Sequence, residues 1–133
     1  MRLLLDTNAY VGMRRGDERV SSLLRDAEEI LISTVVLGEL EYGFFNGRRY
    51  AANKRSLGAF LATPFVSVIG VGAETSNRYG RIAAQLRRAG TPIPTNDVWI
   101  AAHGLETGAN VVSFDRHFGF VDGLAWIDPA TDS

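Results

Sequence analysis

Short, almost wholly apolar segments alternate with longer stretches of helical periodicity, and this limits the possible folds more than any other feature of the sequence. Two of these segments, LLLDTN at residues 3–8 and NVVSFD at residues 110–115, reach an aspartate where their apolar character stops. An apolar run without alternating polar residues is typical of a parallel strand that is covered on both faces. The two segments therefore predict a buried parallel sheet with acids at its edge.

Strands and helices are expected to alternate along the whole chain. The expected strands are residues 2–6, 29–33, 66–69, 110–115 and 125–127, and the expected helices are residues 34–45, 49–61, 74–89 and 97–107. This order predicts an α/β fold, a three-layer sandwich with a mostly parallel central sheet. No repeat or linker interrupts the 133 residues, so we expect residues 1–133 to form a single domain.

The composition excludes several classes of protein. Cysteine is absent, which excludes a disulfide scaffold, a thiol nucleophile and a cysteine-ligated zinc site. The apolar run before Asp6 is too short for a signal peptide, and the longest uncharged stretch is interrupted by Pro64 and by glycines, unlike a membrane span. We therefore expect a cytoplasmic protein that does not enter a membrane. The net charge of −1 provides no general attraction to nucleic acid.

Four acidic residues are expected to meet at one edge of the predicted sheet. Asp6 and Asp115 end two of the strands, and the carboxyl ends of parallel strands share the edge where open α/β sheets bind ligands. Asp97 opens the helix after the loop at residues 90–96, and Glu39 lies just over one turn into the helix that follows the second strand. Each acid alone also has a structural interpretation: Asp6 as a helix cap, Asp97 as a partner of the helix dipole, Asp115 as a turn acid or ion pair, and Glu39 as a solvated side chain.

Acids grouped in this way require compensation. Two carboxylates about 4 Å apart repel by roughly 4 kcal/mol at an effective dielectric constant of about 20. Such a group therefore binds protons or a hard divalent cation such as Mg²⁺, which prefers carboxylate oxygens and retains water. A water activated by the metal can then hydrolyse a phosphodiester bond without a covalent intermediate. No competing nucleophile is evident, because the sequence has no cysteine and no serine within a GxSxG motif.

The two histidines are not at the spacing of metal ligands. His103 falls opposite the apolar face of its helix, so we expect it to be exposed. His117 lies two positions after Asp115 and is a candidate neighbour of the site.

Three segments carry a resemblance to a known family. They are LLLDTN, STVVLGELEYG at residues 33–43 and NDVWIAAHGLETGANVVSFDRHFGFVDGL at residues 96–124. Together and in this order they resemble the PIN-domain ribonucleases, specifically the VapC-type toxins of bacterial toxin–antitoxin pairs, over essentially the whole chain. The resemblance implies cleavage of RNA that depends on Mg²⁺ or Mn²⁺. It also implies a homodimer and a cognate antitoxin protein, of the VapB type or similar, that covers the site.

The resemblance assigns roles to individual residues. The acids that it identifies as metal-holding and catalytic are Asp6, Glu39, Asp97 and Asp115. Asn8, Ser113 and Arg116 correspond to positions that flank the site or contact the substrate.

Helical periodicity alone does not select Glu39. The apolar face of residues 34–45 centres near Leu40, and at roughly 100° per residue Glu39 lies about 120° from that centre whereas Glu41 lies about 80° from it. The pattern slightly favours Glu41 as the inward acid, and the motif match favours Glu39. We follow the motif match.

Two sets of residues between positions 42 and 60 have open interpretations. The aromatic set is either ordinary core or a groove for an antitoxin helix or a dimer mate, and comprises Tyr42, Phe44, Phe45, Tyr50 and Phe60. The basic set is either a solvated face or a patch that steers RNA phosphates or binds an acidic partner, and comprises Arg48, Arg49, Lys54 and Arg55.

The predicted function is a metal-dependent endoribonuclease, and two alternatives remain. One is a catalytically silent PIN-fold module that only binds proteins. The other is a DNA-cleaving nuclease with the same metal site, because no residue of the sequence is recognisable as a reader of the 2′-hydroxyl. A phospho-acceptor receiver domain would need a lysine near the last strands. It is disfavoured, because the only lysine, Lys54, lies in a mid-chain helix. A haloacid-type phosphatase is also disfavoured, because it would require a second aspartate two positions after Asp6, where this sequence has Asn8.

Overall fold

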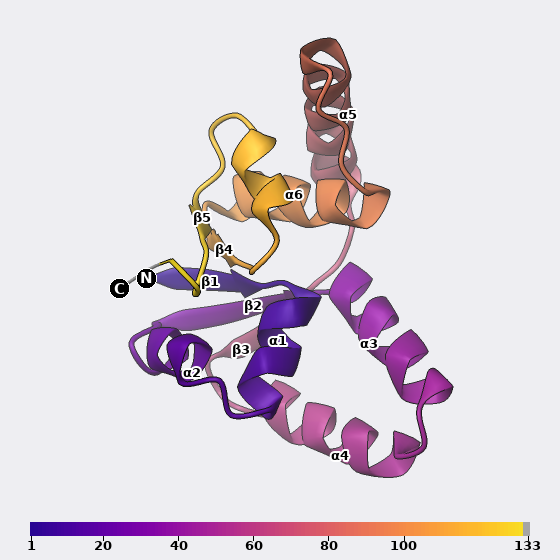
Figure 1. The fold of residues 1–133 in the computed structure, drawn as a ribbon, viewed down its shortest axis with the longest axis vertical. Coiled ribbons are helices and arrows are strands. Elements are labelled where there is room, and N and C mark those ends of the chain that lie inside the picture. The colour runs from indigo at the N-terminus through magenta and orange to yellow at the C-terminus, as the bar shows by residue number, and fades with distance from the viewer. Residues whose placement is uncertain (132–133) are drawn as a thin grey trace.

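A five-stranded parallel sheet forms the centre of the computed structural model, which describes residues 1–131 (Figure 1). The strands are β1 (Arg2–Leu5), β2 (Glu29–Ser33), β3 (Val66–Ile69), β4 (Asn110–Val112) and β5 (Trp126–Ile127). They lie in the order β3-β2-β1-β4-β5, and every neighbouring pair is parallel. The first apolar run therefore occupies the central strand, where Leu3, Leu4 and Leu5 are fully buried.

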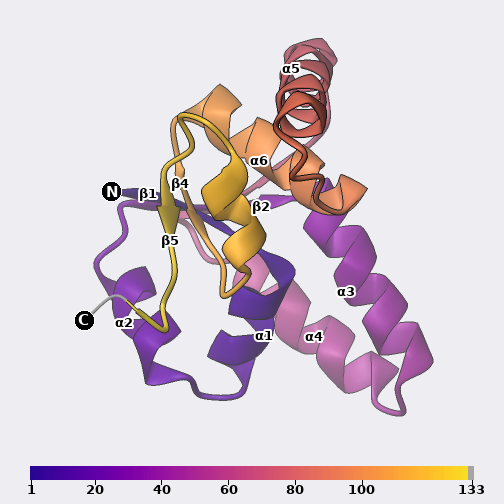
Figure 2. The same cartoon turned by 45° about the horizontal axis from the view of Figure 1, so that its top comes forward.

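Helices cover both faces of the sheet and give the molecule three layers. The helices are α1 (Thr7–Arg14), α2 (Glu18–Arg25), α3 (Thr34–Asn46), α4 (Tyr50–Leu61), α5 (Ala73–Ala89) and α6 (Thr95–Thr107), and a 3₁₀ turn spans Arg116–Phe120. Figures 1 and 2 show α6 on one side of the sheet, α1 and α2 on the other, and α5 packed outside α6. The predicted α/β sandwich is confirmed, and its sheet is parallel throughout.

Alternate residues of β1 face two separate cores. Leu4 packs into the core that contains Ile100 of α6, whereas Leu3 and Leu5 pack into the core that contains Val20 of α2. Both faces of the strand must therefore be apolar, which explains the unbroken run of leucines. Truncation of a fully buried leucine to alanine typically costs about 2–5 kcal/mol.

Polar residues at the strand ends begin the next helices. Asp6 follows β1 and caps α1, because its carboxylate accepts a hydrogen bond of 2.8 Å from the Thr7 amide. Ser33 ends β2 and caps α3 by accepting a hydrogen bond of 3.0 Å from the Val35 amide. These short junctions bring the first turns of α1 and α3 to the carboxyl edge of the sheet.

The sequence pattern predicted all five strands and the helices α3 to α6, but not α1, α2 or the 3₁₀ turn. Both missed helices have only eight residues, and α1 starts immediately after the first strand. The strands expected at residues 2–6 and 110–115 end earlier, at Leu5 and Val112. Their acids leave the sheet because each caps the helical turn that follows.

The expectation that His103 is exposed is wrong. Its side chain is only 1% exposed, with Nδ1 at 3.1 Å from the Ser33 hydroxyl and Nε2 at 3.0 Å from the Gly70 carbonyl. Since a carbonyl can only accept, Nε2 carries the proton in that contact. Helix α6 lies between the sheet and α5, so the side opposite its most apolar face is buried as well. His103 is a structural residue that joins α6 to the ends of β2 and β3.

None of the helices within residues 1–131 combines the length and the apolar character needed to cross a membrane.

Candidate metal centre

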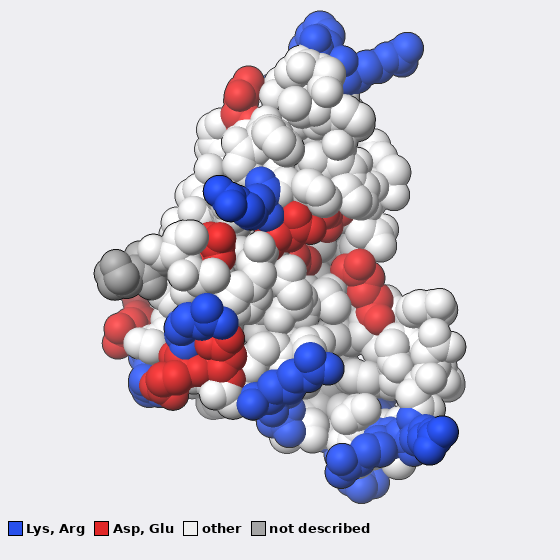
Figure 3. All heavy atoms as spheres, in the orientation of Figure 1, with Lys and Arg blue, Asp and Glu red and all other residues white. Residues whose placement is uncertain are grey.

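The four acids selected from the sequence come together at the carboxyl edge of the sheet. Asp6 and Asp115 lie just beyond β1 and β4, Asp97 lies in the first turn of α6, and Glu39 lies in α3. They are close enough that the charges of Asp97 and Glu39 raise the pKa of Asp6. Figure 3 shows acidic side chains gathered in a recess near the middle of one face of the molecule.

The tightest group in this recess comprises Asp97, Asp115 and His117. Each offers one ligand atom, and the three atoms lie within 4.8 Å of one another. The Nδ1 atom of His117 lies 2.9 Å from Oδ1 of Asp115 and 3.4 Å from Oδ2 of Asp97. Asp115 also caps the 3₁₀ turn by accepting a 3.0 Å hydrogen bond from the His117 amide, which directs the imidazole back toward the acids.

Asp6 is the most buried of the four acids, with a residue exposure of 4%. Burial raises its pKa from the ordinary value of 3.8 to about 6, with smaller contributions from the charges of Asp97 and Glu39. Two hydrogen bonds oppose this rise, one of 2.7 Å from the Ser113 hydroxyl and one of 2.8 Å from the Thr7 amide. The Asp6 carboxylate is therefore fixed in orientation but poorly neutralised.

The pKa of Asp97 is also raised, chiefly by burial and then by the charges of Asp115 and Glu39. The hydrogen bond and the charge of His117 act in the opposite direction. Two neighbouring carboxyls with raised pKa values indicate a site whose negative charge is incompletely balanced by the protein.

The structure places Glu39, and not Glu41, with the other acids. Glu39 Oε1 accepts a 2.7 Å hydrogen bond from the Thr7 hydroxyl, and its Oε2 accepts one of 3.3 Å from the side-chain amide of Asn96. Glu41 instead accepts a 2.8 Å hydrogen bond from the Tyr50 hydroxyl and forms an ion pair with Lys54. The recess lies at the edge of the sheet and not under the apolar face of α3. The position of that face along the helix therefore does not show which glutamate reaches the recess.

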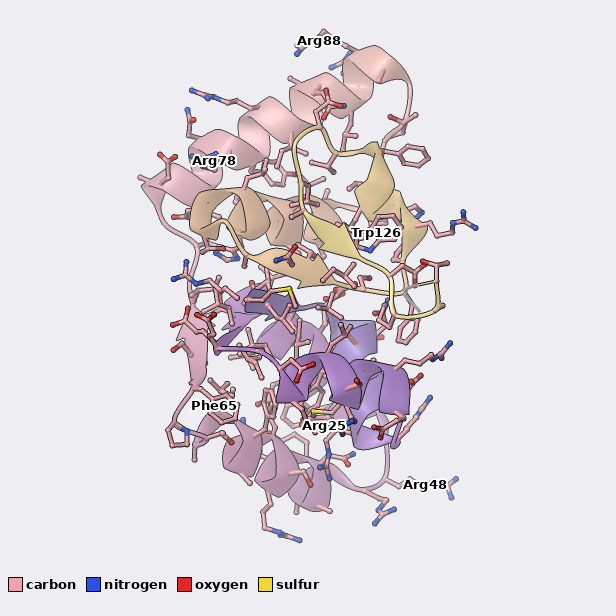
Figure 4. All side chains as sticks on the ribbon, turned by 90° about the vertical axis from the view of Figure 1, so that its left-hand side faces the viewer. Arg25, Arg48, Phe65, Arg78, Arg88 and Trp126 are labelled. Atoms are coloured by element: carbon pink, nitrogen blue, oxygen red, sulfur yellow. The ribbon has the colours of Figure 1, made fainter. Side chains whose placement is uncertain are left out.

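Two of the predicted flanking residues form a network behind the acids. The Ser113 hydroxyl donates to Asp6 and accepts hydrogen bonds from the Asn8 side chain at 3.2 Å and from the Asp115 amide at 2.9 Å. The backbone carbonyl of Ser113 accepts a 3.0 Å bond from the indole of Trp126, which Figure 4 labels beside the C-terminal strand. This network ties the ends of β1, β4 and β5 together.

Arg116, the third predicted flanking residue, differs from the other two. It begins the 3₁₀ turn, and its side chain is exposed. Within residues 1–131 it makes no ion pair.

Sequence reasoning did not assign three residues of the site, Thr7, Asn96 and His117, to it. Thr7 and Asn96 orient Glu39, and each is adjacent in sequence to an acid of the site. His117 was only a candidate neighbour, although its position two residues after an acid that caps a turn is a signal for such a contact. Cap geometry of this kind depends on the following turn, which the pattern did not predict.

A groove leads away from the recess between α1, α3 and α4. It encloses about 610 Å³, and Thr7 and Glu39 form the end next to the acids. Three exposed arginines line it farther out, namely Arg14, Arg15 and Arg49, and we call them the groove arginines. No carboxylate within residues 1–131 forms an ion pair with any of them.

Fold and site together define a class of protein. A recess of carboxylates at the carboxyl edge of a parallel α/β sheet, with raised pKa values and hydrogen-bonded acids, is the kind of site that holds a divalent cation. The donors are mainly oxygen, which fits a hard ion, and one imidazole nitrogen is within reach.

Comparison with known proteins identifies the family. The family model of the PIN domain matches residues 3–124 of this chain. The chain is 31% identical to Ribonuclease VapC1 of Haemophilus influenzae strain R2866, over 96% of this chain and 98% of the relative. It is also 31% identical to Ribonuclease VapC2 of Rickettsia felis, over 85% and 86% of the two chains. The chain belongs to the PIN-domain family.

Solved structures support the same assignment. The fold matches VapBC2 from Rickettsia felis bound to a promoter DNA fragment, with a TM-score of 0.84, 26% identity and coverage of 96% of this chain and 98% of that one. It also matches DNA-bound VapBC from Salmonella typhimurium, with a TM-score of 0.85, 26% identity and coverage of 97% and 98%. The family and the fold expected from the sequence are both confirmed.

Proposed function

We propose that this protein is an endoribonuclease that acts as the toxin of a toxin–antitoxin pair and depends on a divalent cation. The observation that carries the proposal is the convergence of four carboxylates in one recess, in a chain whose relatives are named VapC ribonucleases. Asp6, Glu39, Asp97 and Asp115 are the proposed catalytic and metal-holding residues.

The donor set fits Mg²⁺ or Mn²⁺. Carboxylate oxygens are the preferred ligands of both ions, and burial without a cation raises the pKa of Asp6 to about 6. We propose that Asp97 and Asp115 hold the ion together, with Asp6 and Glu39 beside them; the proximity of these acids supports this assignment. When bound, a divalent cation would lower the pKa of water and polarise a phosphoryl oxygen, which is the chemistry of phosphodiester hydrolysis.

The residues around the acids maintain their geometry and charge. Ser113 and Thr7 hold the two oxygens of Asp6, so its orientation is fixed before any ligand arrives. Thr7 and Asn96 hold Glu39 in the same way. Thr7 therefore links the end of β1 to α3, because it donates hydrogen bonds to the carboxylates of both Asp6 and Glu39.

The groove arginines supply a path for the RNA backbone. Arginine binds phosphate through a rigid fork of donors, and these three lie in a groove whose lining includes Glu39 of the acidic recess. Figure 3 shows basic side chains on the same face as the acidic recess. Of the basic set expected from the sequence, Arg49 lines this groove, whereas Lys54 is paired with Glu41. The arrangement supports Arg49 as a phosphate contact.

An antitoxin and a second copy of the chain are the proposed protein partners. Structural relatives were solved as VapBC complexes, and one is described as a toxin–antitoxin complex from Klebsiella pneumoniae. Of the aromatic set, Tyr42 and Phe45 on α3 are 71% and 72% exposed, whereas Phe60 packs edge-on against buried Tyr10. The aromatic set thus divides into core residues and an apolar surface that a partner can cover.

Matched substrates test the proposal against its alternatives. An RNA oligonucleotide and a DNA oligonucleotide of the same sequence are incubated with the purified protein in Mn²⁺ or Mg²⁺, with EDTA as the control. Cleavage of the RNA alone, abolished by EDTA, is the expected result. Equal cleavage of the RNA and the DNA oligonucleotide would favour the DNA nuclease. Metal binding without cleavage of either oligonucleotide would favour the silent binding module.

A further inference from the structure

The imidazole of His117 occupies a position that the proposed oxygen-ligand site does not explain. It extends from the 3₁₀ turn, which is anchored because the next residue, Phe118, is 1% exposed in the core. The ring nitrogen Nδ1 faces Asp97 and Asp115. The ring itself remains partly exposed, with a side-chain exposure of 43%. His117 is thus held at the mouth of the recess with a nitrogen directed inward.

The two distances from Nδ1 are those of neighbouring ligands on one ion. An octahedral ion with bonds of about 2.1 Å separates adjacent ligand atoms by about 3 Å. Nδ1 lies 2.9 Å from Asp115 Oδ1 and 3.4 Å from Asp97 Oδ2. One ligand atom from each of the three residues lies within 4.8 Å of the others, so a shift of one carboxylate would let them share an ion.

We infer that His117 is a nitrogen ligand of the metal and that it makes the site selective for first-row transition ions, such as Mn²⁺, over Mg²⁺. The inference rests on the proposed metal site at the four acids. Mg²⁺ demands oxygen ligands and retains water, whereas imidazole binds transition ions and does so more strongly along the series from Mn²⁺ to Co²⁺. A nitrogen ligand in an otherwise carboxylate site therefore shifts the preference toward transition ions.

Metal affinity in His117→Gln separates a ligand from a residue that only orients the acids. Mn²⁺ affinity is measured by electron paramagnetic resonance, Co²⁺ affinity by visible absorption, and Mg²⁺ affinity by competition with Mn²⁺. We expect the variant to lose about tenfold or more in Mn²⁺ affinity, a larger factor for Co²⁺, and less than about threefold for Mg²⁺. An equal loss for all three ions would show an orienting role and overturn the inference. Glu41→Gln, outside the recess, is the control that should bind every ion as the wild type does.

A spectroscopic signature provides a second readout. Pulsed electron paramagnetic resonance of the Mn²⁺ protein should show ¹⁴N coupling from a coordinated imidazole, and His117→Gln should lose it. The other histidine, His103, cannot produce this signal, because it is buried in contact with Ser33 and Gly70. Bound Mn²⁺ without ¹⁴N coupling in the wild type would contradict the inference.

These measurements contain no RNA, so they separate the inference from the proposed function. Nitrogen-coupled Mn²⁺ in a protein that cleaves no RNA would support the role of His117 and refute the nuclease. Metal-dependent cleavage without nitrogen coupling would support the nuclease and refute the role of His117. Failure to bind any of the three ions would overturn both.

Discussion

Replacement of Asp6 by asparagine is expected to stabilise the metal-free protein while it abolishes metal-dependent activity. The pKa of Asp6 rises from 3.8 to about 6 on folding, so the ionised carboxylate is less favourable in the folded state than in the unfolded chain. At about 1.4 kcal/mol per pKa unit this corresponds to a cost of roughly 3 kcal/mol above pH 6. Asparagine removes the charge and can still accept a hydrogen bond from Thr7, but it perturbs the contact with Ser113. We therefore expect a net gain of about 1–2 kcal/mol at pH 7.5.

The sign of this effect fixes its dependence on pH. Because the folded-state pKa of Asp6 is the higher one, the folded protein binds more protons between pH 3.8 and about 6. The contribution of Asp6 to stability is therefore least favourable above pH 6 and becomes less unfavourable as the pH falls through 6 toward 3.8. Asp6→Asn should lack this contribution.

Chemical denaturation in EDTA at pH 5.5 and pH 7.5 measures the effect. The variant should exceed the wild type in free energy of unfolding, and by more at the higher pH. Mn²⁺ should reverse the order, because the wild type alone gains stability from binding the ion. Asp17→Asn is the contrasting control, since Asp17 caps α2 and its pKa is lowered by its hydrogen bond with Arg19. A variant of Asp6 that is less stable than the wild type in EDTA at pH 7.5 would refute the reasoning.

Three further predictions concern catalysis, RNA binding and packing. Glu39→Gln should lower the cleavage rate by about 100-fold or more, while Glu41→Gln stays within about twofold, and the reverse order would disprove our choice of glutamate. Glutamine at all three groove arginines should reduce the salt dependence of single-stranded RNA binding, by a slope of up to about 2, in fluorescence anisotropy. Glutamine at Arg87 and Arg88, in the last turn of α5, is the control; Figure 4 shows Arg88 at the opposite end of the molecule from Arg48. Equal salt dependence in the two variants would refute the proposed path of the RNA. Gly104→Ala should destabilise the fold by about 1–3 kcal/mol in denaturant titrations, because the new methyl group would lie 2.8 Å from a Leu124 side-chain carbon; unchanged stability would show that the contact relaxes.

The sequence was informative where the pattern of apolar residues depends on a single feature of the fold, such as whether both faces of a strand are covered. Unbroken apolar runs such as that of β1 are possible only when both faces of a strand are covered, so the parallel sheet and its order of elements were predictable. From this topology alone the carboxyl ends of β1 and β4 had to share an edge, which placed Asp6 and Asp115 near each other.

Details that depend on three-dimensional packing were not predictable in this way. Periodicity describes the most apolar side of a helix, but α6 is covered on two sides, and so His103 is buried on the side expected to be exposed. The same limit applies to α3, where the apolar face favoured Glu41 and the edge of the sheet selects Glu39. The contact of His117 with the acids depends on a 3₁₀ turn that the apolar pattern did not predict.

Cleavage of a labelled RNA by wild-type protein and by Asp97→Asn, purified in parallel, tests the central claim most directly. Asp97 lies 3.4 Å from His117, and its pKa is raised by burial and by the charges of Asp115 and Glu39. Loss of its charge should therefore prevent metal-dependent cleavage, whereas asparagine, which has nearly the same shape, should leave the fold intact. We predict Mn²⁺-dependent cleavage by the wild type that is abolished by EDTA, and a reduction of at least about 100-fold in the variant at unchanged circular dichroism. Cleavage by Asp97→Asn at the wild-type rate would contradict the account, because the activity would then not depend on the acids of this site.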